Sequence, residues 1–164
     1  MSKTTANLEA AFAGESQANR KYLAFAEKAD KEGLAQVAKL FRAAAAAETV
    51  HAHAHLRLLK GIGSTKENLM TAIAGETHEF KEMYPAMIED AKAEGERAAE
   101  RYFGFANAVE EVHACLYEKA LNDPEGLPAT EYYVCSVCGH VHEGKPTEKC
   151  PVCSAKPEAY FLVD

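Results

Sequence analysis

The chain lacks both a run of basic residues and a long run of apolar residues. Its 18 Lys and Arg residues are outnumbered by 25 Asp and Glu residues, which leaves a net charge of -7. A chain without a basic block lacks the electrostatic footprint of nucleic-acid binding, and its acidity argues against binding to anionic membranes. The opening segment MSKTTANLEAAF has no signal-like apolar stretch, and no segment approaches the roughly 18 apolar residues of a membrane span. We therefore expect a cytoplasmic protein with no nucleic-acid or membrane partner.

Cysteine is nearly absent until the C-terminal part of the chain. Four of the five cysteines fall between Cys135 and Cys153, and the fifth is Cys115. In a reducing compartment, such clustering indicates metal binding rather than disulfide formation.

Runs of β-branched residues are scarce up to Leu121, where Ala, Glu, Lys and Leu dominate. This composition favours helices. The following segment, NDPEGLPATE, reads as a linker, and the remainder has the turn-rich character of a small metal-bound domain. The sequence thus predicts a mainly α fold with a helical domain over 1–122, a linker over 123–130 and a metal domain over 131–164.

The helical part contains an internal repeat. AFAGES, ending in Glu15–Ser16, aligns with AIAGET at an offset of 61, whereas Gly33 aligns with Gly95 at an offset of 62. Each half is expected to be a helical hairpin that turns at its glycine. The change of offset inserts one residue around Glu79, and a helix absorbs an insertion most easily as a π-bulge.

Each hairpin also carries a Glu-x-x-His motif in its second helix. Residues at i and i+3 share a helix face, so each motif can offer one carboxylate and one imidazole to the same metal. One further glutamate from each first helix completes a set that matches the di-iron or di-manganese site of ferritin-like bundles. Solvated surface charges are the alternative, but two copies in register argue against it. The set is Glu15, Glu48, His51, Glu76, Glu110 and His113.

The motifs CSVC and CPVC, eleven residues apart, form a second candidate metal site. Tetrahedral thiolate sites hold zinc or iron, and this spacing alone is typical of a structural zinc ribbon. The surrounding residues, however, resemble rubredoxin, which holds one iron by four cysteines. The candidate ligands are Cys135, Cys138, Cys150 and Cys153.

Taken in order, AGES, ETVH, AGETHE, EEVH and the two cysteine motifs resemble the rubrerythrin family over essentially the whole chain. The resemblance implies a ferritin-like four-helix domain with two irons per chain, plus a rubredoxin-like domain with one iron, or zinc, per chain. It implies a peroxidase that reduces hydrogen peroxide to water, with a rubredoxin or an NAD(P)H-dependent reductase as electron donor. A ferroxidase or iron-storage protein is the alternative function, and a non-enzymatic zinc-ribbon module is a second one.

The resemblance also implies a role for each ligand. Glu48 and Glu110 bridge the irons, whereas Glu15 and Glu76 are terminal ligands. His113 completes one iron, and the other iron moves between His51 when reduced and Glu79 when oxidised. Two positions depart from the family pattern: His140 stands where an aromatic residue is common, and Ser154 stands where glycine usually follows the second cysteine motif.

The connection between the hairpins bears on assembly. Gly61 is expected to cap one helix, and Ser64 with Glu67 forms a capping box for the next. In a ferritin-like bundle these two helices are parallel, so the connection must span about 34 Å back along the bundle. The five extended residue-to-residue steps of the connection reach only about 17 Å. Either the bundle is a simple up-down one, or two chains exchange hairpins. The family topology favours a hairpin-swapped homodimer.

Overall fold

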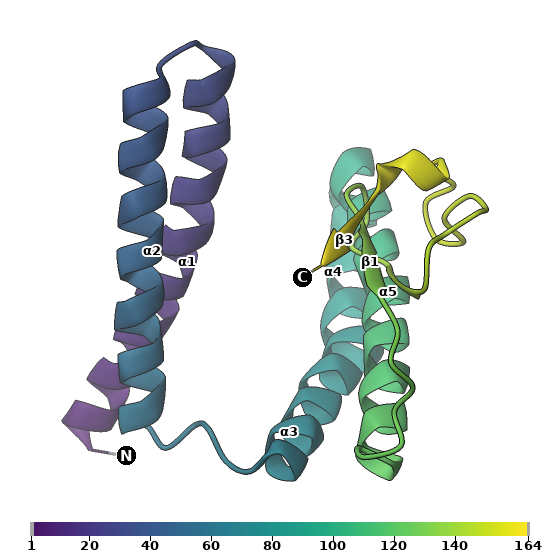
Figure 1. The fold of residues 1–164 in the computed structure, drawn as a ribbon, viewed down its shortest axis with the longest axis horizontal. Coiled ribbons are helices and arrows are strands. Elements are labelled where there is room, and N and C mark those ends of the chain that lie inside the picture. The colour runs from purple at the N-terminus through teal and green to yellow at the C-terminus, as the bar shows by residue number, and fades with distance from the viewer. Residues whose placement is uncertain (1, 164) are drawn as a thin grey trace. The chain divides into compact units, whose positions relative to one another are not determined.

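The computed structural model describes residues 2–163, which form two compact units (Figure 1). One unit ends at Gly63 and the other begins at Ser64. The predicted linker, 123–130, lies inside the second unit, where it joins a helical hairpin to a small sheet. The prediction of a mainly helical chain with a small C-terminal metal-site domain is confirmed.

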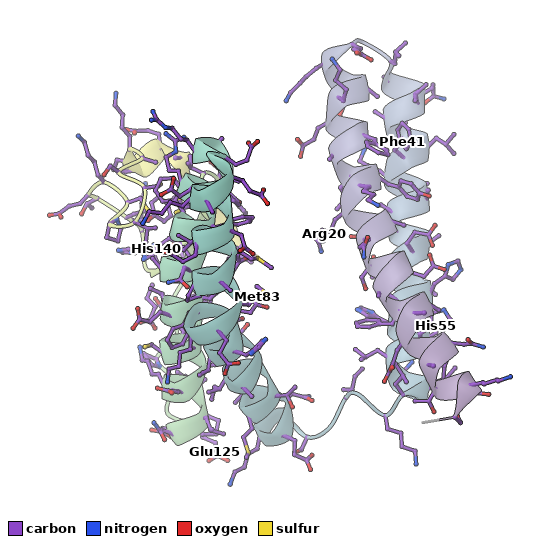
Figure 2. All side chains as sticks on the ribbon, turned by 180° about the vertical axis from the view of Figure 1, so that it is seen from behind. Arg20, Phe41, His55, Met83, Glu125 and His140 are labelled. Carbon is purple, nitrogen blue, oxygen red and sulfur yellow. The ribbon has the colours of Figure 1, made fainter. Side chains whose placement is uncertain are left out.

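The first unit is a helical hairpin. Helix α1 (Lys3–Lys31) begins after Ser2, whose hydroxyl accepts a hydrogen bond from the Thr5 backbone N–H, and α2 (Ala35–Leu58) follows a turn at Gly33. Gly33 has a φ of 76°, a left-handed conformation that glycine adopts without a steric penalty. Small side chains let the two helices approach closely, and the buried alanines are Ala26, Ala29, Ala38, Ala45 and Ala52. Phe41, labelled in Figure 2, packs against this core.

The connection between the two units is partly as predicted. The capping box at Ser64 and Glu67 is present, with the Ser64 hydroxyl accepting from the Glu67 backbone N–H and the Glu67 carboxylate accepting from the Ser64 backbone N–H. The expected glycine cap at Gly61 is wrong by one residue, because Lys60 takes the left-handed position with a φ of 56°. Gly61 instead donates its backbone N–H to the Leu56 carbonyl, which closes the helix in a Schellman-type turn.

The second unit opens with another helical hairpin. Helix α3 (Thr65–His78) continues through a π-helical turn η1 (Glu79–Met83) into α4 (Tyr84–Glu94), and α5 (Arg97–Asn122) returns after a turn at Gly95. The π-helical turn confirms the bulge that the changed repeat offset predicts.

A three-stranded antiparallel sheet ends the second unit. Its strands are β1 (Tyr132–Cys135), β2 (Val141–Glu143) and β3 (Tyr160–Val163), in the order β2-β1-β3. The sheet and its cysteine loops form one core with Val109 of α5, which is only 2% exposed. The small domain is thereby fixed directly against the second helical hairpin. None of the helices within residues 2–163 is long and apolar enough to cross a membrane.

Candidate metal centres

Four cysteine side chains converge between the two loops of the C-terminal domain. The sulfur atoms of Cys135 and Cys153 are 3.7 Å apart, and those of Cys138 and Cys150 are 3.5 Å apart. A disulfide requires about 2.05 Å. A tetrahedral ion with metal–sulfur bonds of about 2.3 Å separates its sulfur ligands by about 3.8 Å. The four thiols therefore match a tetrahedral metal site rather than two disulfides.

The two cysteine loops fold in the same way. The Gly139 backbone N–H donates to the Cys135 carbonyl at 2.8 Å, and the Ser154 N–H donates to the Cys150 carbonyl at 2.9 Å. Both residues after the loops have positive φ, 86° for Gly139 and 61° for Ser154. Ser154 thus holds the conformation that glycine usually supplies, at a cost of about 1–2 kcal/mol. The departure from the family pattern leaves the loop geometry intact.

Burial disfavours the charged form of two of the four thiols in the absence of a cation. Burial raises the pKa of Cys138 and of Cys153, because a thiolate loses its hydration there. A bound cation reverses this preference, since it stabilises the deprotonated sulfurs that ligate it. The cage therefore fits a thiophilic metal ion.

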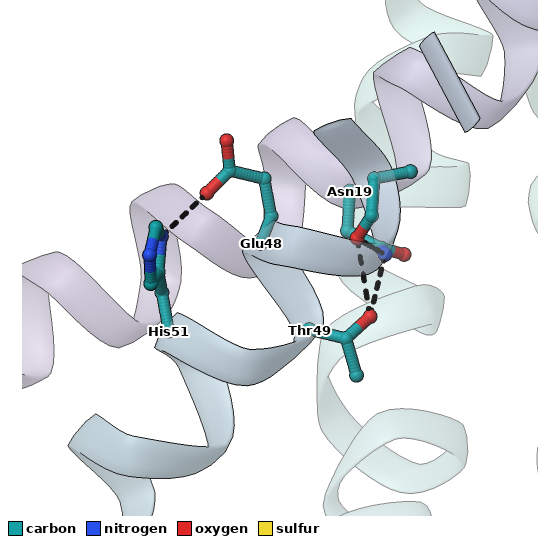
Figure 3. Close-up of polar contacts among 5 residues, drawn as sticks. Asn19, Glu48, Thr49 and His51 are labelled. Carbon is teal, nitrogen blue, oxygen red and sulfur yellow. Dashed lines mark hydrogen bonds and ion pairs between the residues drawn. The ribbon is translucent and has the colours of Figure 1, made fainter. Parts of the chain in front are cut away.

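The first helical hairpin brings together Glu15 from α1 with Glu48 and His51 from α2. One potential ligand atom from each lies within 4.8 Å of the others. His51 Nδ1 is 2.9 Å from a Glu48 carboxylate oxygen, as the dashed line in Figure 3 marks. The His51 side chain is 56% exposed, so this half-site is open.

A residue that the sequence reasoning missed fixes the register of this hairpin. Asn19 is buried, and its side-chain amide donates to the Ala45 carbonyl at 2.7 Å and to the Thr49 hydroxyl at 2.9 Å (Figure 3). Asn19 lies one helical turn after Glu15, and Thr49 directly follows Glu48. In the sequence, Asn19 could have been recognised as a polar residue on the same face of α1 as Glu15.

The second hairpin repeats the arrangement with Glu76 from α3 and with Glu110 and His113 from α5. His113 Nδ1 lies 2.7 Å from a Glu110 carboxylate oxygen, and the His113 side chain is only 24% exposed. Burial and the charge of Glu110 raise the pKa of Glu76, an effect that the nearby His113 opposes. Crowded carboxylates with a raised pKa are stabilised by a cation placed between them.

Glu79 lies on the π-helical turn and outside that group of three. Its charge still contributes to raising the pKa of Glu76, after the larger effects of burial, Glu110 and His113. The same charge, with that of Glu110, adds to the effect of burial in raising the pKa of the Tyr84 hydroxyl. A further carboxylate is therefore close to the second half-site, whereas the repeat has Ala18 at the corresponding place in the first.

Comparison with known proteins assigns these features to one family. The sequence model described as Rubrerythrin matches residues 6–121, and the model described as Rubrerythrin, rubredoxin-like domain matches residues 133–161. The chain belongs to the rubrerythrin family. The resemblance drawn from the motifs is confirmed.

Individual relatives agree with this assignment. Nigerythrin of Nitratidesulfovibrio vulgaris is 38% identical, over 92% of this chain and 81% of the relative. The rubrerythrin of Porphyromonas gingivalis is 39% identical, over 98% of this chain and 89% of the relative. A solved structure of fully reduced, all-ferrous nigerythrin matches with a TM-score of 0.60 and 35% identity, over 99% of this chain and 88% of that one.

Membership of the rubrerythrin family identifies the metal that the three clusters fit. The glutamate and histidine clusters of the hairpins fit the two irons of a rubrerythrin di-iron site, and the four-cysteine cage fits a rubredoxin-like iron. The fit rests on the donors themselves: oxygen and nitrogen ligands in the helices, and four sulfurs at tetrahedral spacing in the sheet domain.

Proposed function

We propose that this rubrerythrin is a non-haem di-iron peroxidase that reduces hydrogen peroxide to water, with electrons delivered through the four-cysteine iron. The observation that carries the proposal is the carboxylate of Glu79, which the π-helical turn adds beside Glu76 in one hairpin only. A simple duplicated di-iron bundle needs no such asymmetry.

The proposed ligands are the two half-sites, Glu15, Glu48, His51, Glu76, Glu110 and His113, together with Glu79. When bound, two ferrous ions supply the two electrons that cleavage of the peroxide O–O bond requires. The glutamates would hold the two ions and neutralise their charge. The hydroxyl of Tyr84 stays protonated, because burial and the charges of Glu110 and Glu79 raise its pKa, and it therefore remains a hydrogen-bond donor near the carboxylates.

Glu79 has a specific role in this proposal. Histidine nitrogen suits the ferrous state, whereas an additional anionic oxygen favours the harder ferric state. We propose that Glu79 replaces His51 as a ligand after oxidation, as the family resemblance implies.

The route for electrons is supported by the packing of the second unit. Val109, which precedes Glu110 in α5, belongs to the same buried cluster as Cys135, Cys138 and Cys150. The proposed donor to this iron is a rubredoxin or an NAD(P)H-dependent reductase. We propose the cytoplasm as the compartment, because four clustered thiols remain reduced there.

The peroxidase proposal is tested by reducing the iron-loaded protein without oxygen, adding hydrogen peroxide in slight excess and following the oxidation of both centres by absorption. An excess is needed because each peroxide accepts two electrons, whereas the three ferrous ions of a chain supply three. Peroxide should oxidise both centres much faster than air does. Slower oxidation by peroxide than by air would overturn the proposal. Rapid oxidation and retention of many added ferrous ions, without turnover of the four-cysteine iron, would instead favour the ferroxidase alternative.

Glu79→Ala tests the role of the added carboxylate. We expect the variant to bind two irons in the helical domain but to reduce peroxide at least about tenfold more slowly, the loss typical of removing one stabilising group. Glu82→Ala is the matched control: it removes a carboxylate from the same π-helical turn, but that side chain is 74% exposed. Equal activity of the two variants would refute the role of Glu79.

We also propose a homodimer whose chains exchange hairpins. Six residues, 59–64, connect α2 to α3. Fully extended, the seven steps from Leu58 to Thr65 span about 24 Å. The 24 residues of α2 are about 36 Å long. A parallel arrangement of α2 and α3 within one bundle is therefore beyond the reach of the connection, and exchange with a second copy removes this conflict.

Complementation distinguishes exchange from a single-chain bundle. Glu48→Ala disables the first hairpin, and Glu110→Ala disables the second. If bundles form between chains, unfolding and refolding a mixture of the two variants should restore about one di-iron site in four, because half of the dimers are mixed and each has one intact pair of hairpins. No restored site, or a monomer that retains both irons, would overturn the dimer proposal.

A further inference from the structure

The small sheet domain is held against α5 at two separate points. The first is the buried core that Val109 shares with the cysteine loops, where a Cβ placed on Gly139 would lie 3.9 Å from a Val109 methyl group. The second is an ion pair, in which the Lys119 ammonium donates to both carboxylate oxygens of Glu143, at 2.7 and 2.9 Å. Lys119 belongs to α5 and Glu143 to β2, and the sheet lies beside α5 in Figure 1.

The two points lie on either side of the second half-site. Val109 and Lys119 are ten residues apart in α5, which is about 15 Å along the helix. Two ligands of the half-site, Glu110 and His113, fall between them in the sequence. A single point of contact leaves the domain free to pivot about it, whereas a second point at this distance fixes its orientation. The ion pair therefore helps to set how the cysteine cage is turned toward the half-site.

Packing between the two points is not continuous. A cavity of about 390 Å³ lies there between α5 and the sheet, and its lining includes His113 and Tyr132. The connection from α5 to β1 does not fix the orientation, because residues 123–131 reach about 30 Å when extended. Among the residues that the structure describes, the pair of Lys119 and Glu143 is the one ion pair that joins the sheet domain to a helix.

We propose that Lys119 and Glu143 form a positioning pair, which holds the cysteine cage in the orientation needed for electron transfer to the second half-site of the same chain. In this step the four-cysteine iron gives one electron and goes from ferrous to ferric, and one ferric ion of the di-iron site becomes ferrous. Electron transfer slows steeply as two centres move apart, so a pivot of the cage away from α5 slows it. An exposed ion pair adds little to stability, but selecting one orientation of a domain that is already attached requires little free energy. The inference rests on the proposed electron route and not on the identity of the external donor.

Charge reversal tests whether the pair sets the orientation. Lys119→Glu places two carboxylates against each other, and adding Glu143→Lys restores an ion pair of opposite polarity. Lys66→Glu is the matched control, since it makes the same charge change at an exposed position of α3 in the same unit. Residual dipolar couplings of the full chain, loaded with diamagnetic zinc in place of iron, report the orientation without any redox step. We expect one alignment tensor to fit α5 and the sheet in the parent chain, in Lys66→Glu and in the double variant, but two different tensors in Lys119→Glu. One shared tensor in Lys119→Glu, or two in the parent chain, would overturn the proposal.

The iron-loaded chain tests the electron transfer itself. After anaerobic reduction and mixing with peroxide, the return of the thiolate-to-iron absorption reports the oxidation of the four-cysteine iron. We expect this return to be about threefold slower in Lys119→Glu, a factor within the range for an exposed ion pair, and to recover in the double variant. Oxidation of the di-iron site by peroxide should be unchanged.

The two measurements separate the possible failures. An unchanged return of the absorption in Lys119→Glu, or no recovery in the double variant, would overturn the role of the pair in electron transfer. A parent chain that peroxide does not oxidise would instead contradict the peroxidase proposal, and the dipolar couplings would still decide whether the pair positions the cage.

Discussion

Asn19→Ala is the substitution that most directly probes how the first half-site is built. The change removes two buried hydrogen bonds between α1 and α2, to the Ala45 carbonyl and the Thr49 hydroxyl. Each is worth about 1 kcal/mol net. No buried group is left without a partner, because the Thr49 hydroxyl still donates to the Ala45 carbonyl at 3.2 Å. Alanine also has the better helix propensity, by about 0.5 kcal/mol. The free energy of unfolding should therefore fall by about 1.5 kcal/mol.

The same substitution should weaken iron binding, because these hydrogen bonds set the height of Glu15 on α1 relative to Glu48 on α2. We expect the ferrous affinity of the helical domain to fall severalfold while the four-cysteine iron is unaffected. Urea unfolding followed by circular dichroism, at fixed protein concentration, gives the stability, and anaerobic ferrous titration gives the affinity.

Gln17→Ala is the control, since it removes an exposed amide from the same helix and should change neither quantity. If Asn19→Ala unfolds at the same urea concentration as Gln17→Ala and binds iron equally well, the two hydrogen bonds do not hold the register, and the reasoning fails.

Three further predictions concern the second unit. Val109→Ala should destabilise the second unit by about 2 kcal/mol, because it leaves a cavity beside the four-cysteine core. A chelator should then remove the four-cysteine iron faster from the variant than from the parent chain. An unchanged rate would contradict this prediction. Gly95→Ala should cost about 1–2 kcal/mol of unfolding free energy, because its φ is 76°. Gly104→Ala should instead raise the unfolding free energy by about 1 kcal/mol, because a Cβ at this position in α5 meets open space. The urea midpoints of the two variants should therefore shift in opposite directions, and shifts in the same direction would refute both predictions. Hydrogen bonds from Ser64 lower the pKa of Glu67, so its stabilising contribution is present above the ordinary pKa of glutamate and is lost as the pH falls through the lowered value. The stability of Glu67→Gln should accordingly vary less with pH than that of the parent chain, and identical profiles would contradict the capping role.

The positions of the helical turns and of the π-helical turn were predictable, because they depend on the local spacing of residues in the sequence. Gly33 and Gly95 occupy equivalent places in the repeat, and both take left-handed turns with a φ of 76°. The one-residue change of offset near Glu79 predicted the π-helical turn, since an inserted residue in a continuous helix must be absorbed locally. The Glu-x-x-His spacing likewise fixes which side chains share a helix face.

Features that depend on packing between segments were not predictable in this way. Lys60 takes the left-handed cap that Gly61 was expected to supply, because the helix ends where the Schellman-type hydrogen bonds close, not where the most permissive residue stands. Asn19 reads as an ordinary polar helix residue until α2 is placed beside it. The contact of the cysteine loops with Val109 requires the orientation of the small domain, which a linker sequence does not encode.

The two hairpins share a ligand pattern, but the first one also leaves large apolar side chains exposed. This exposed surface links assembly to metal binding. In the part of the first unit that the structure describes, the buried residues are alanines and Asn19, and large side chains such as Leu40 and Val50 remain 68% and 64% exposed. Burying such side chains stabilises an assembly by about 25 cal/mol for each Å² removed from water. In the proposed dimer, a second hairpin that covers this surface would also supply further iron ligands. If that hairpin comes from a partner, iron binds the assembled form in preference to the separate chains, so iron loading and dimer formation stabilise each other by mass action.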